Sequence, residues 1–265
     1  MLELLQYPFV QRACAAGLIL ALLAPLLGIF LVVRRLSLLA DCLAHAGLAG
    51  VAAALVTGLN PLFTALGVSS ASALLIERLR MRQGRFAEGV LGLILWSGLA
   101  LAVLLASMGP GRNLDLMSYL FGSITTVSAE ELGWIFALAL LAGGLLLLFF
   151  KELFLVSLDE SLAQVSGVNP ARYNYLLILL ASLVVALFMR ILGVLLIGAM
   201  MVVPVLTALN LKGGFKTTLA WAVGFALAAV FVGLGLSLHF DIAAGGAIVL
   251  SAVAIYLVSL FFKVP

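Results

Sequence analysis

The sequence predicts an all-α fold, a polytopic integral membrane helix bundle with about eight or nine transmembrane helices. Of its 265 residues, 65% are hydrophobic and only 9% are charged, and the mean hydropathy is +1.32. Soluble domains carry roughly 25% charged residues. Residues 42–76 contain no Asp, Glu, Lys or Arg. Because no polar stretch is long enough for a separate soluble domain, residues 1–265 are expected to form one transmembrane domain.

Charge-free stretches mark the expected spans, since a helix needs about 20 apolar residues to cross a bilayer. Asn60-Pro61 divides the second stretch, because proline interrupts a helix and Asn-Pro favours a turn. Residues 113–127 are short and moderately apolar, which favours an interfacial or re-entrant helix. The short third span and the tight 189–191 connection leave the count at eight or nine. The nine-span version is 13–33, 35–57, 61–76, 88–107, 131–150, 173–189, 191–210, 216–237 and 243–262.

The basic residues are distributed unequally between the two sides of this nine-span arrangement. One side holds Arg34, Arg35, Arg78, Arg80, Arg82, Arg85, Lys151, Arg172, Lys212, Lys216 and Lys263. The other side holds only Arg12, Arg112 and Arg190. The positive-inside rule makes the first set cytoplasmic. The placement of the basic residues is therefore what matters in this chain, and its net charge of +3 does not indicate a nucleic-acid partner.

The most informative polar residues are Asp41 and His45, which fall inside the second expected span. If that helix begins near Arg35, a rise of 1.5 Å per residue puts Asp41 about 9 Å and His45 about 15 Å into the membrane. Their i, i+4 spacing puts both on one helix face. A carboxylate in hydrocarbon is costly and usually functional. Carboxylate and imidazole together suit Zn²⁺ or Mn²⁺.

Two ligands hold a metal weakly, which suits a protein that must release it, and a two-fold homodimer would supply a second pair. The alternative for Asp41 and His45 is a hydrogen bond between packed helices. Cys42 could add a soft third ligand, although it points about 100° away from Asp41 on a helix of 3.6 residues per turn and could equally be a small buried thiol.

A second pair, His239 and Asp241, is expected at the outer end of the eighth span. This pair could be an entry-side ligand pair or an external gate, and it could equally be part of a solvated loop. A third feature, residues 157–170, reads as a short amphipathic cytoplasmic helix ended by Gly167 and Pro170. The segment is either a docking surface for another protein or an ordinary loop. No arrangement of catalytic residues is present, so the chain is not expected to be an enzyme.

Five segments, in order along almost the whole chain, together resemble the metal-ion (zinc, manganese or iron) permeases of ATP-binding-cassette importers, and most closely the zinc-uptake members. These segments are 34–47 (RRLSLLADCLAHAG), 115–122 (DLMSYLFG), 159–167 (DESLAQVSG), 193–208 (GVLLIGAMMVVPVLTA) and 241–245 (DIAAG). The sequence differs from the family at Cys42, where a small residue is usual, and at Ala243-Ala244, where the family tends to have proline.

The resemblance implies a type II importer fold and a homodimeric permease in the bacterial inner membrane. It also implies a cytoplasmic ATPase subunit, which carries the hydrolytic activity, and a periplasmic metal-binding protein. Asp41 and His45 match the positions of metal passage, and Asp159, Glu160, Ala163 and Gly167 match the loop that docks on the ATPase. Zn²⁺ is expected as the transported substrate, and no cofactor is expected.

Two further functions stay open beside zinc import. One is a manganese or iron permease of the same family, because carboxylate and imidazole bind several divalent metals. The other is an ion-coupled secondary transporter. Such transporters usually carry inverted repeats, and they usually carry several intramembrane acids. Asp41 is the one convincing acid within the expected spans.

Overall fold

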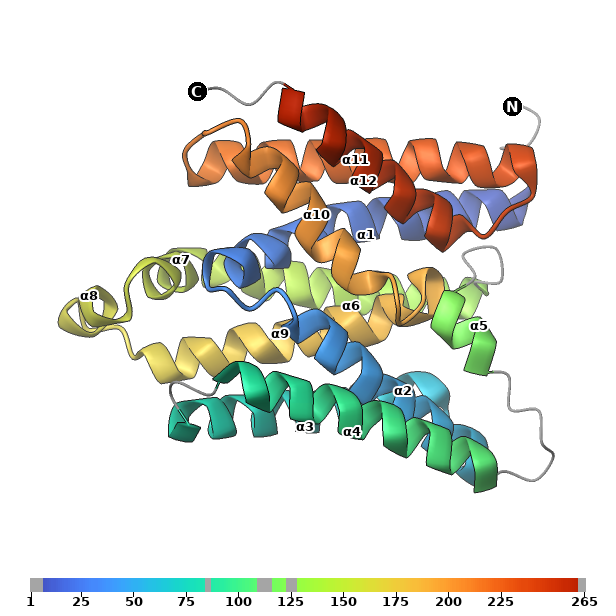
Figure 1. Ribbon diagram of the computed structural model, residues 1–265, viewed down its shortest axis with the longest axis horizontal. Coiled ribbons are helices and arrows are strands. Elements are labelled where there is room, and N and C mark those ends of the chain that lie inside the picture. Colours follow the sequence, from blue (N-terminus) through green and yellow to red (C-terminus); the bar gives the residue numbers. More distant parts are fainter. Residues whose placement is uncertain (1–6, 84–86, 109–115, 123–127, 262–265) are drawn as a thin grey trace.

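The computed structural model describes residues 7–83, 87–108, 116–122 and 128–261, and all regular structure in these ranges is helical. The helices run lengthwise through an elongated bundle (Figure 1). Their bounds are α1 Pro8–Val33, α2 Leu39–Thr57, α3 Pro61–Gln83, α4 Ala87–Met108, α5 Leu116–Phe121, α6 Ala129–Leu148, α7 Phe150–Leu158, α8 Glu160–Val165, α9 Pro170–Leu192, α10 Ile197–Leu209, α11 Phe215–Phe240 and α12 Ala244–Phe261.

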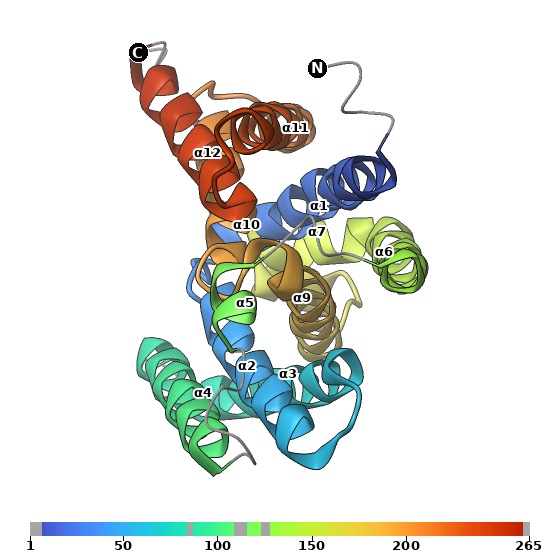
Figure 2. The ribbon, with the colours of Figure 1, turned by 90° about the vertical axis from the view of Figure 1, so that its right-hand side faces the viewer.

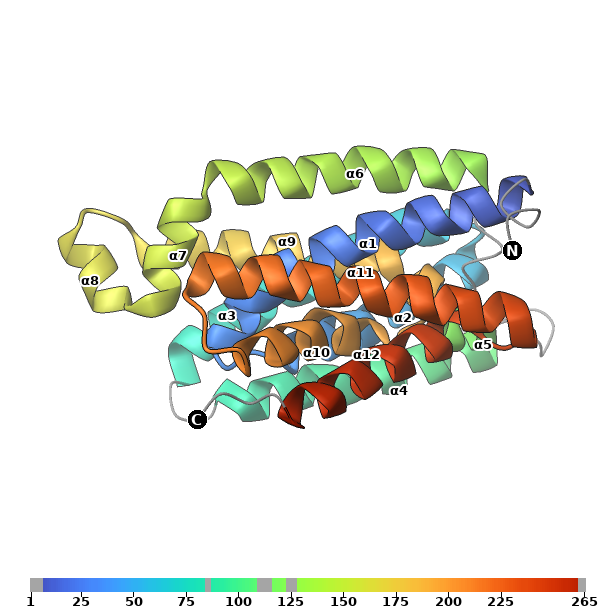
Figure 3. The same cartoon turned by 90° about the horizontal axis from the view of Figure 1, so that it is seen from above.

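Within the described residues, eight helices are long and apolar enough to cross a membrane: α1, α2, α3, α4, α6, α9, α11 and α12. The expected span 191–210 is instead the 13-residue α10, which is about 20 Å long against a hydrocarbon thickness of about 30 Å. Even so, α1 begins at one end of the bundle and α12 runs toward the other (Figures 1 and 3). Because the first long helix starts at one end and the last one finishes toward the other, the number of crossings must be odd. With eight long helices, α10 therefore serves as a short ninth crossing.

Two helix boundaries differ from the sequence-based expectation. Helix α3 continues to Gln83, so most of the expected basic loop is helical. Helix α2 begins at Leu39 rather than near Arg35, because Arg35 adopts a left-handed backbone with φ of 58°. The Leu36 amide then donates to the Leu31 carbonyl over 2.7 Å, which turns the connection back along the bundle before α2 starts (Figure 1). The depths expected for Asp41 and His45 from continuous helical rise consequently do not apply.

The helices form three groups when the bundle is viewed along its length. Figure 2 shows α2, α3 and α4 on one side, α11 and α12 on the other, and α1, α6, α9 and α10 between them. A cluster of phenylalanines ties α7 to this framework. Phe30 of α1 and Phe215 of α11 have ring centroids 5.5 Å apart, and Phe154 of α7 lies 4.7 Å from Phe215. The short helices α7 and α8 project from the end opposite to α5 (Figure 3).

The non-helical residues between α9 and α10 pack directly, backbone against backbone, on α5. Gly193 has φ of 88°, a backbone conformation that residues other than glycine rarely adopt. A Cβ at Gly193 would also overlap the Leu120 carbonyl. The Val194 amide donates to the Tyr119 carbonyl over 2.9 Å. This contact between residues 193–194 and α5 determines where α10 starts, beside the N-terminal half of α2. The expected re-entrant segment 113–127 is described only over residues 116–122, which contain α5.

The basic residues of the larger set gather at one end of the molecule where the structure describes them. They follow α1, end α3, start α9 and precede or start α11, and these helix ends lie at the end that carries α8 (Figure 1). Arg190, from the smaller set, lies at the opposite end of α9 and forms an ion pair with Glu131 of α6. Arg85, Arg112 and Lys263 lie outside the described residues. The observed helix directions thus reproduce the expected charge asymmetry.

Candidate metal-passage site

Asp41 and His45 stand out in burial along about the first four turns of α2. Every other residue from Leu39 to Ala52 is buried, whereas these two are half-buried. Helix α4 packs so closely on one flank that a Cβ at Gly98 would lie 3.0 Å from the His45 carbonyl carbon. Helix α10 lies on the other flank (Figure 2). The two side chains that carry ligand chemistry are therefore the two residues of this stretch that are not fully buried.

The hydrogen bond of His45 fixes which ring nitrogen is free. Its Nδ1 lies 2.8 Å from the backbone carbonyl oxygen of Asp41, one helical turn earlier. Because a carbonyl oxygen only accepts, Nδ1 must carry the proton and donate. The lone pair of the neutral ring then resides on Nε2. Metal-binding histidines typically use this arrangement, in which a backbone carbonyl orients the ring and sets the tautomer.

The Asp41 carboxylate lies in the first turn of α2 and against the first turn of α10. A Cβ at Gly198 would overlap the Asp41 carboxylate, so glycine is what allows the carboxylate to sit there. Helix N-termini stabilise negative charge, which lowers the cost of holding the Asp41 carboxylate here. The carboxylate makes no hydrogen bond to the other residues that the structure describes. Its oxygens therefore remain available to a cation.

Cys42 lies beside Asp41 in sequence but faces the opposite flank. It is fully buried, and its Sγ donates to the Leu91 carbonyl of α4 over 3.1 Å. This thiol is engaged with α4 rather than directed toward Asp41 and His45. The geometry corresponds to a small buried thiol that packs two helices together.

His239 and Asp241 lie at the far end of α11 from its basic start. Both residues are exposed, and Asp241 caps the helix in a left-handed conformation with φ of 54°. The His239 ring packs edge-to-face on Phe240 with centroids 4.8 Å apart. The pair is thus exposed at the end of α11 opposite to its basic start, and it does not join Asp41 and His45. Across the described residues, no three His, Cys, Asp or Glu side chains gather as a metal cluster.

The segment expected to be an amphipathic helix ended by glycine and proline is α8 and its flanks. Asp159 caps α8, accepting from the amides of Ser161 at 2.7 Å and Leu162 at 3.0 Å. These backbone hydrogen bonds hold the pKa of Asp159 below its usual range. Gly167 ends the turn with φ of 80°, and Pro170 starts α9. The expected short helix ended by Gly167 and Pro170 is thus confirmed.

Helix α8 presents apolar side chains to solvent. Val165 is 88% exposed and Leu162 is 54% exposed, whereas Ala163 is fully buried against the body of the protein. Single exposed apolar residues are normal, but exposed apolar side chains on a projecting helix are typical of a binding surface. The helix therefore has one face that holds it to the bundle and another that is free to bind a partner.

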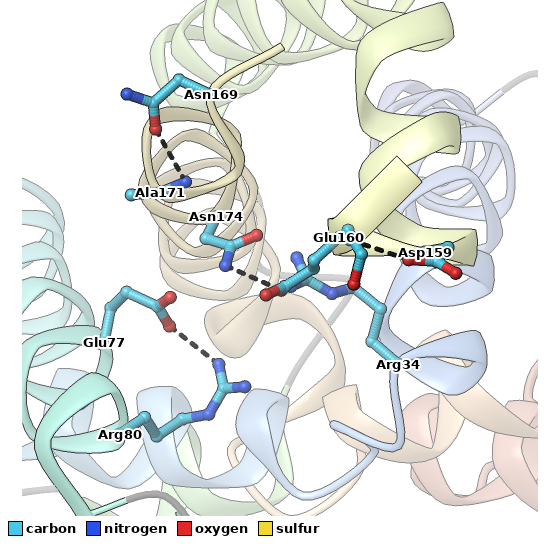
Figure 4. A network of polar contacts seen from close by, with 9 residues as sticks. Arg34, Glu77, Arg80, Asp159, Glu160, Asn169, Ala171 and Asn174 are labelled. Atoms are coloured by element: carbon cyan, nitrogen blue, oxygen red, sulfur yellow. Dashed lines mark hydrogen bonds and ion pairs between the residues drawn. The ribbon is translucent and has the colours of Figure 1, made fainter. Parts of the chain in front are cut away.

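Sequence reasoning missed the contact that holds α8 to the bundle. Arg34 Nη2 lies 2.6 Å from Glu160 Oε1, and the Asn174 amide donates to the same oxygen over 3.1 Å (Figure 4). Glu77 of α3, only 1% exposed, pairs with Arg80 over 2.7 Å in the same region. Arg34 and Glu160 are far apart in sequence and follow no motif spacing, so only the fold could bring them together.

Among its described residues the structure thus combines eight helices able to span a membrane, a half-buried carboxylate–imidazole pair on α2 and the projecting helix α8. The chain belongs to the ABC 3 transport family, whose model matches residues 6–263, and it is a metal-ion permease of the ATP-binding-cassette type. The resemblance noted from the sequence is thereby confirmed. Metal is the transported substrate of this family rather than a resident cofactor.

Three relatives and one solved structure match almost the full length of the chain. The "probable metal transport system membrane protein" of Treponema pallidum (strain Nichols) is 36% identical, over 95% of this chain and 94% of that protein. The manganese import system permease protein ScaB of Streptococcus gordonii is 31% identical, over 96% and 91%. The high-affinity zinc uptake system membrane protein ZnuB of Haemophilus influenzae (strain ATCC 51907 / DSM 11121 / KW20 / Rd) is 28% identical, over 94% and 95%. PsaBC from Streptococcus pneumoniae, solved with a Fab, superimposes with a TM-score of 0.87 at 30% identity, over 98% and 94%.

Proposed function

We propose that this chain is the permease subunit of an ATP-driven importer that moves Zn²⁺ across the bacterial inner membrane into the cytoplasm. The observation that carries the proposal is the pair Asp41 and His45, the two half-buried residues in an otherwise buried stretch of α2. The whole chain forms the single transmembrane domain, and ATP hydrolysis takes place on a separate subunit.

Zinc is favoured by the ligand chemistry of the pair. Zn²⁺ takes imidazole nitrogen and carboxylate oxygen at about 2.0–2.2 Å, usually with four ligands. Each chain offers the Nε2 of His45 and the oxygens of Asp41, so one protomer leaves the coordination incomplete. We propose a two-fold homodimer in which the open face between α4 and α10 meets its symmetry mate and brings a second pair to the axis. Incomplete coordination within each chain also favours release.

Helix α8 is the proposed docking element for the cytoplasmic ATPase. Asp159 caps the helix, Glu160 and buried Ala163 hold it against the bundle, and Gly167 ends the turn. The exposed faces of Leu162 and Val165 then enter the ATPase surface. A periplasmic metal-binding protein would deliver zinc to the opposite end, where the surface pair His239 and Asp241 lies.

Transport requires the metal to bind one conformation of the permease better than the other. ATP binding and hydrolysis on the partner would shift the dimer between outward-open and inward-open states. The carboxylate of Asp41 is well placed to sense this change, because it lies where α2 meets the start of α10. A small movement between these two helices alters the distance between the ligands of the site.

Manganese is the second candidate cargo. It is favoured by the similarity to a permease named for manganese import, at 31% identity over 96% of this chain. Oxygen ligands suit Mn²⁺, whereas the free imidazole nitrogen of His45 shifts the preference toward Zn²⁺. Competition between the two ions for uptake decides between them: a zinc permease takes up labelled zinc in the presence of equal manganese.

The proposal is tested by metal uptake into proteoliposomes that contain the permease and its ATPase. Asp41→Asn removes the carboxylate charge and His45→Gln removes the imidazole nitrogen, and each keeps a polar side chain of similar length. We expect each to lower ATP-dependent zinc uptake at least about tenfold. The reason is that mutating a residue that only supports a metal ligand already lowers metal affinity or activity about 10- to 100-fold.

The matched controls are Asp241→Asn and His239→Gln, which make the same chemical changes at the exposed outer pair. We expect these controls to transport at a much higher rate than the Asp41 and His45 variants. Wild-type uptake by Asp41→Asn and His45→Gln would contradict the proposed site. Uptake driven by a proton gradient without ATP would instead support a secondary transporter.

A further inference from the structure

One charged side chain links helix α8 to the connection between α1 and α2, the helix proposed to bear the metal. Arg34, directly after α1, reaches Glu160 at the start of α8 with an Nη2–Oε1 distance of 2.6 Å (Figure 4). The two ends of this ion pair differ in burial: the Arg34 side chain is 7% exposed and the Glu160 side chain is 53% exposed. The guanidinium is therefore anchored inside the bundle, and the carboxylate moves with the projecting helix.

Arg34 also begins the short connection that leads to Asp41. The connection is held by backbone hydrogen bonds, from Arg35 to the Val32 carbonyl at 3.0 Å and from Leu36 to the Leu31 carbonyl at 2.7 Å. A further bond from Leu39 to the Leu36 carbonyl, at 2.9 Å, leads into α2. No flexible linker separates Arg34 from the first turn of α2. A displacement of Arg34 is therefore passed to the backbone that carries Asp41.

On its Arg34 side, the ion pair lies beside a second, mostly buried pair of charges. Glu77 pairs with Arg80 over 2.7 Å and is 1% exposed. Among the described residues, Arg80 Nε and Asn174 Oδ1 are buried without a hydrogen-bond partner. A buried network with an unused donor and an unused acceptor can adopt a second pairing, and elements with two discrete arrangements are what carry coupling between distant sites.

We propose that Arg34 and Glu160 are positioning residues that couple movement of α8 to the geometry of the metal site. The inference rests on the proposed function, and it names the route by which the docking helix reaches Asp41 and His45. When α8 shifts with the ATPase, Glu160 pulls or releases the buried Arg34 guanidinium. Because an unpaired buried charge is costly, Arg34 follows its partner, and the start of α2 moves relative to α10.

The test separates coupling from binding and from folding. Glu160→Gln and Arg34→Gln are assembled with the ATPase partner in proteoliposomes, and zinc uptake, ATP hydrolysis and equilibrium ⁶⁵Zn binding are measured in parallel. We expect zinc binding and hydrolysis to persist while the zinc transported per ATP falls about tenfold, within the range for coupling between two sites. A residue with only a structural role would change assembly and all three quantities together.

The matched control is Arg172→Gln, which removes an exposed arginine close to α8 that has no ion pair among the described residues. We expect its transport-to-hydrolysis ratio to equal the wild-type ratio. The charge-reversed double variant, Arg34→Glu with Glu160→Arg, restores the pair and is expected to recover most of the ratio lost in the single variants. If the double variant fails to assemble, the ratio for Glu160→Gln alone decides.

An unchanged transport-to-hydrolysis ratio in Glu160→Gln would overturn the coupling role. So would a double variant that assembles but transports no better than either single variant. Failure of the proposed function looks different, because zinc would then not bind the wild-type complex or would bind Asp41→Asn equally well. The ratio measurement and the binding measurement thus test the two proposals separately.

Discussion

Asp41 and His45 show how far local spacing predicts a site. The i, i+4 interval places both residues on one face of any helix, so the sequence alone could pair them. The tautomer of His45 also has a local cause, because the accepting carbonyl belongs to Asp41 one turn earlier. The contact of the carboxylate with Gly198 on α10 could not be predicted, since the spacing within α2 carries no information about a helix much later in the chain.

Gly198 offers the most direct test of that contact. In Gly198→Ala the new methyl group overlaps the Asp41 carboxylate and forces it to move. We expect zinc affinity to fall about tenfold, the lower end of what displaced supporting groups cost at metal sites. The measurement is equilibrium ⁶⁵Zn binding to the purified complex.

The control for this change is Gly224→Ala on α11, where an added Cβ meets nothing within 4 Å. We expect zinc affinity there to remain at the wild-type value. Equal affinity in the Gly198 and Gly224 variants would mean that the position of the Asp41 carboxylate does not matter for binding.

Among the elements, α8 and α2 differ in how well their boundaries could be predicted. The bounds of α8 follow from local signals: a capping aspartate, a terminal glycine and the proline that begins α9. The start of α2 could not be predicted, because the left-handed backbone of Arg35 has no marker in the sequence. The backward turn before Leu39 is fixed by packing and by the ion pair of Arg34, which depend on distant residues.

Asp159→Ala tests the element that the ATPase is proposed to recognise. Loss of the cap leaves the Ser161 and Leu162 amides without their acceptor, so α8 is expected to open more often. Hydrogen exchange over residues 160–165 should become faster, whereas Asp159→Asn, which keeps a capping oxygen, should stay close to wild type. Equally slow exchange in Asp159→Ala and wild type would show that the cap does not stabilise α8.

The same residue gives the helix a pH dependence with a definite sign. Backbone hydrogen bonds lower the pKa of Asp159 in the folded state. The stabilisation is therefore present above the usual carboxyl pKa of about 3.9 and is lost as the pH falls through the lower folded value. Exchange in wild-type α8, after correction for its intrinsic pH dependence, should rise on acidification, and Asp159→Ala should lack this rise.

At the scale of the whole molecule, hydropathy and charge predict the class and orientation of the bundle but not the form of every pass. Long apolar runs identify eight helices among the described residues, because membrane spans must be apolar along their length. The run 191–210 has the right composition, yet Gly193 and its packing on α5 delay the helix until Ile197. A contact between distant backbones thus shortened a pass that composition could not distinguish from a full one.

Topology is tested with single cysteines at the two ends of α11, in a background lacking Cys14 and Cys42. His239→Cys should react with an impermeant maleimide applied to intact cells, and Lys216→Cys should react only after permeabilisation. The reason is that α10 returns the chain to the basic end, which the positive-inside rule predicts to be cytoplasmic, before α11 begins. Labelling of Lys216→Cys from outside would contradict this path.

The most direct measurement is anomalous X-ray scattering from the assembled transporter loaded with zinc. We predict an anomalous peak within about 2.0–2.2 Å of His45 Nε2 and an Asp41 carboxylate oxygen. A peak found only at His239 and Asp241, or elsewhere, while Asp41 and His45 keep their metal-free contacts, would contradict the assignment of α2 as the metal-bearing helix.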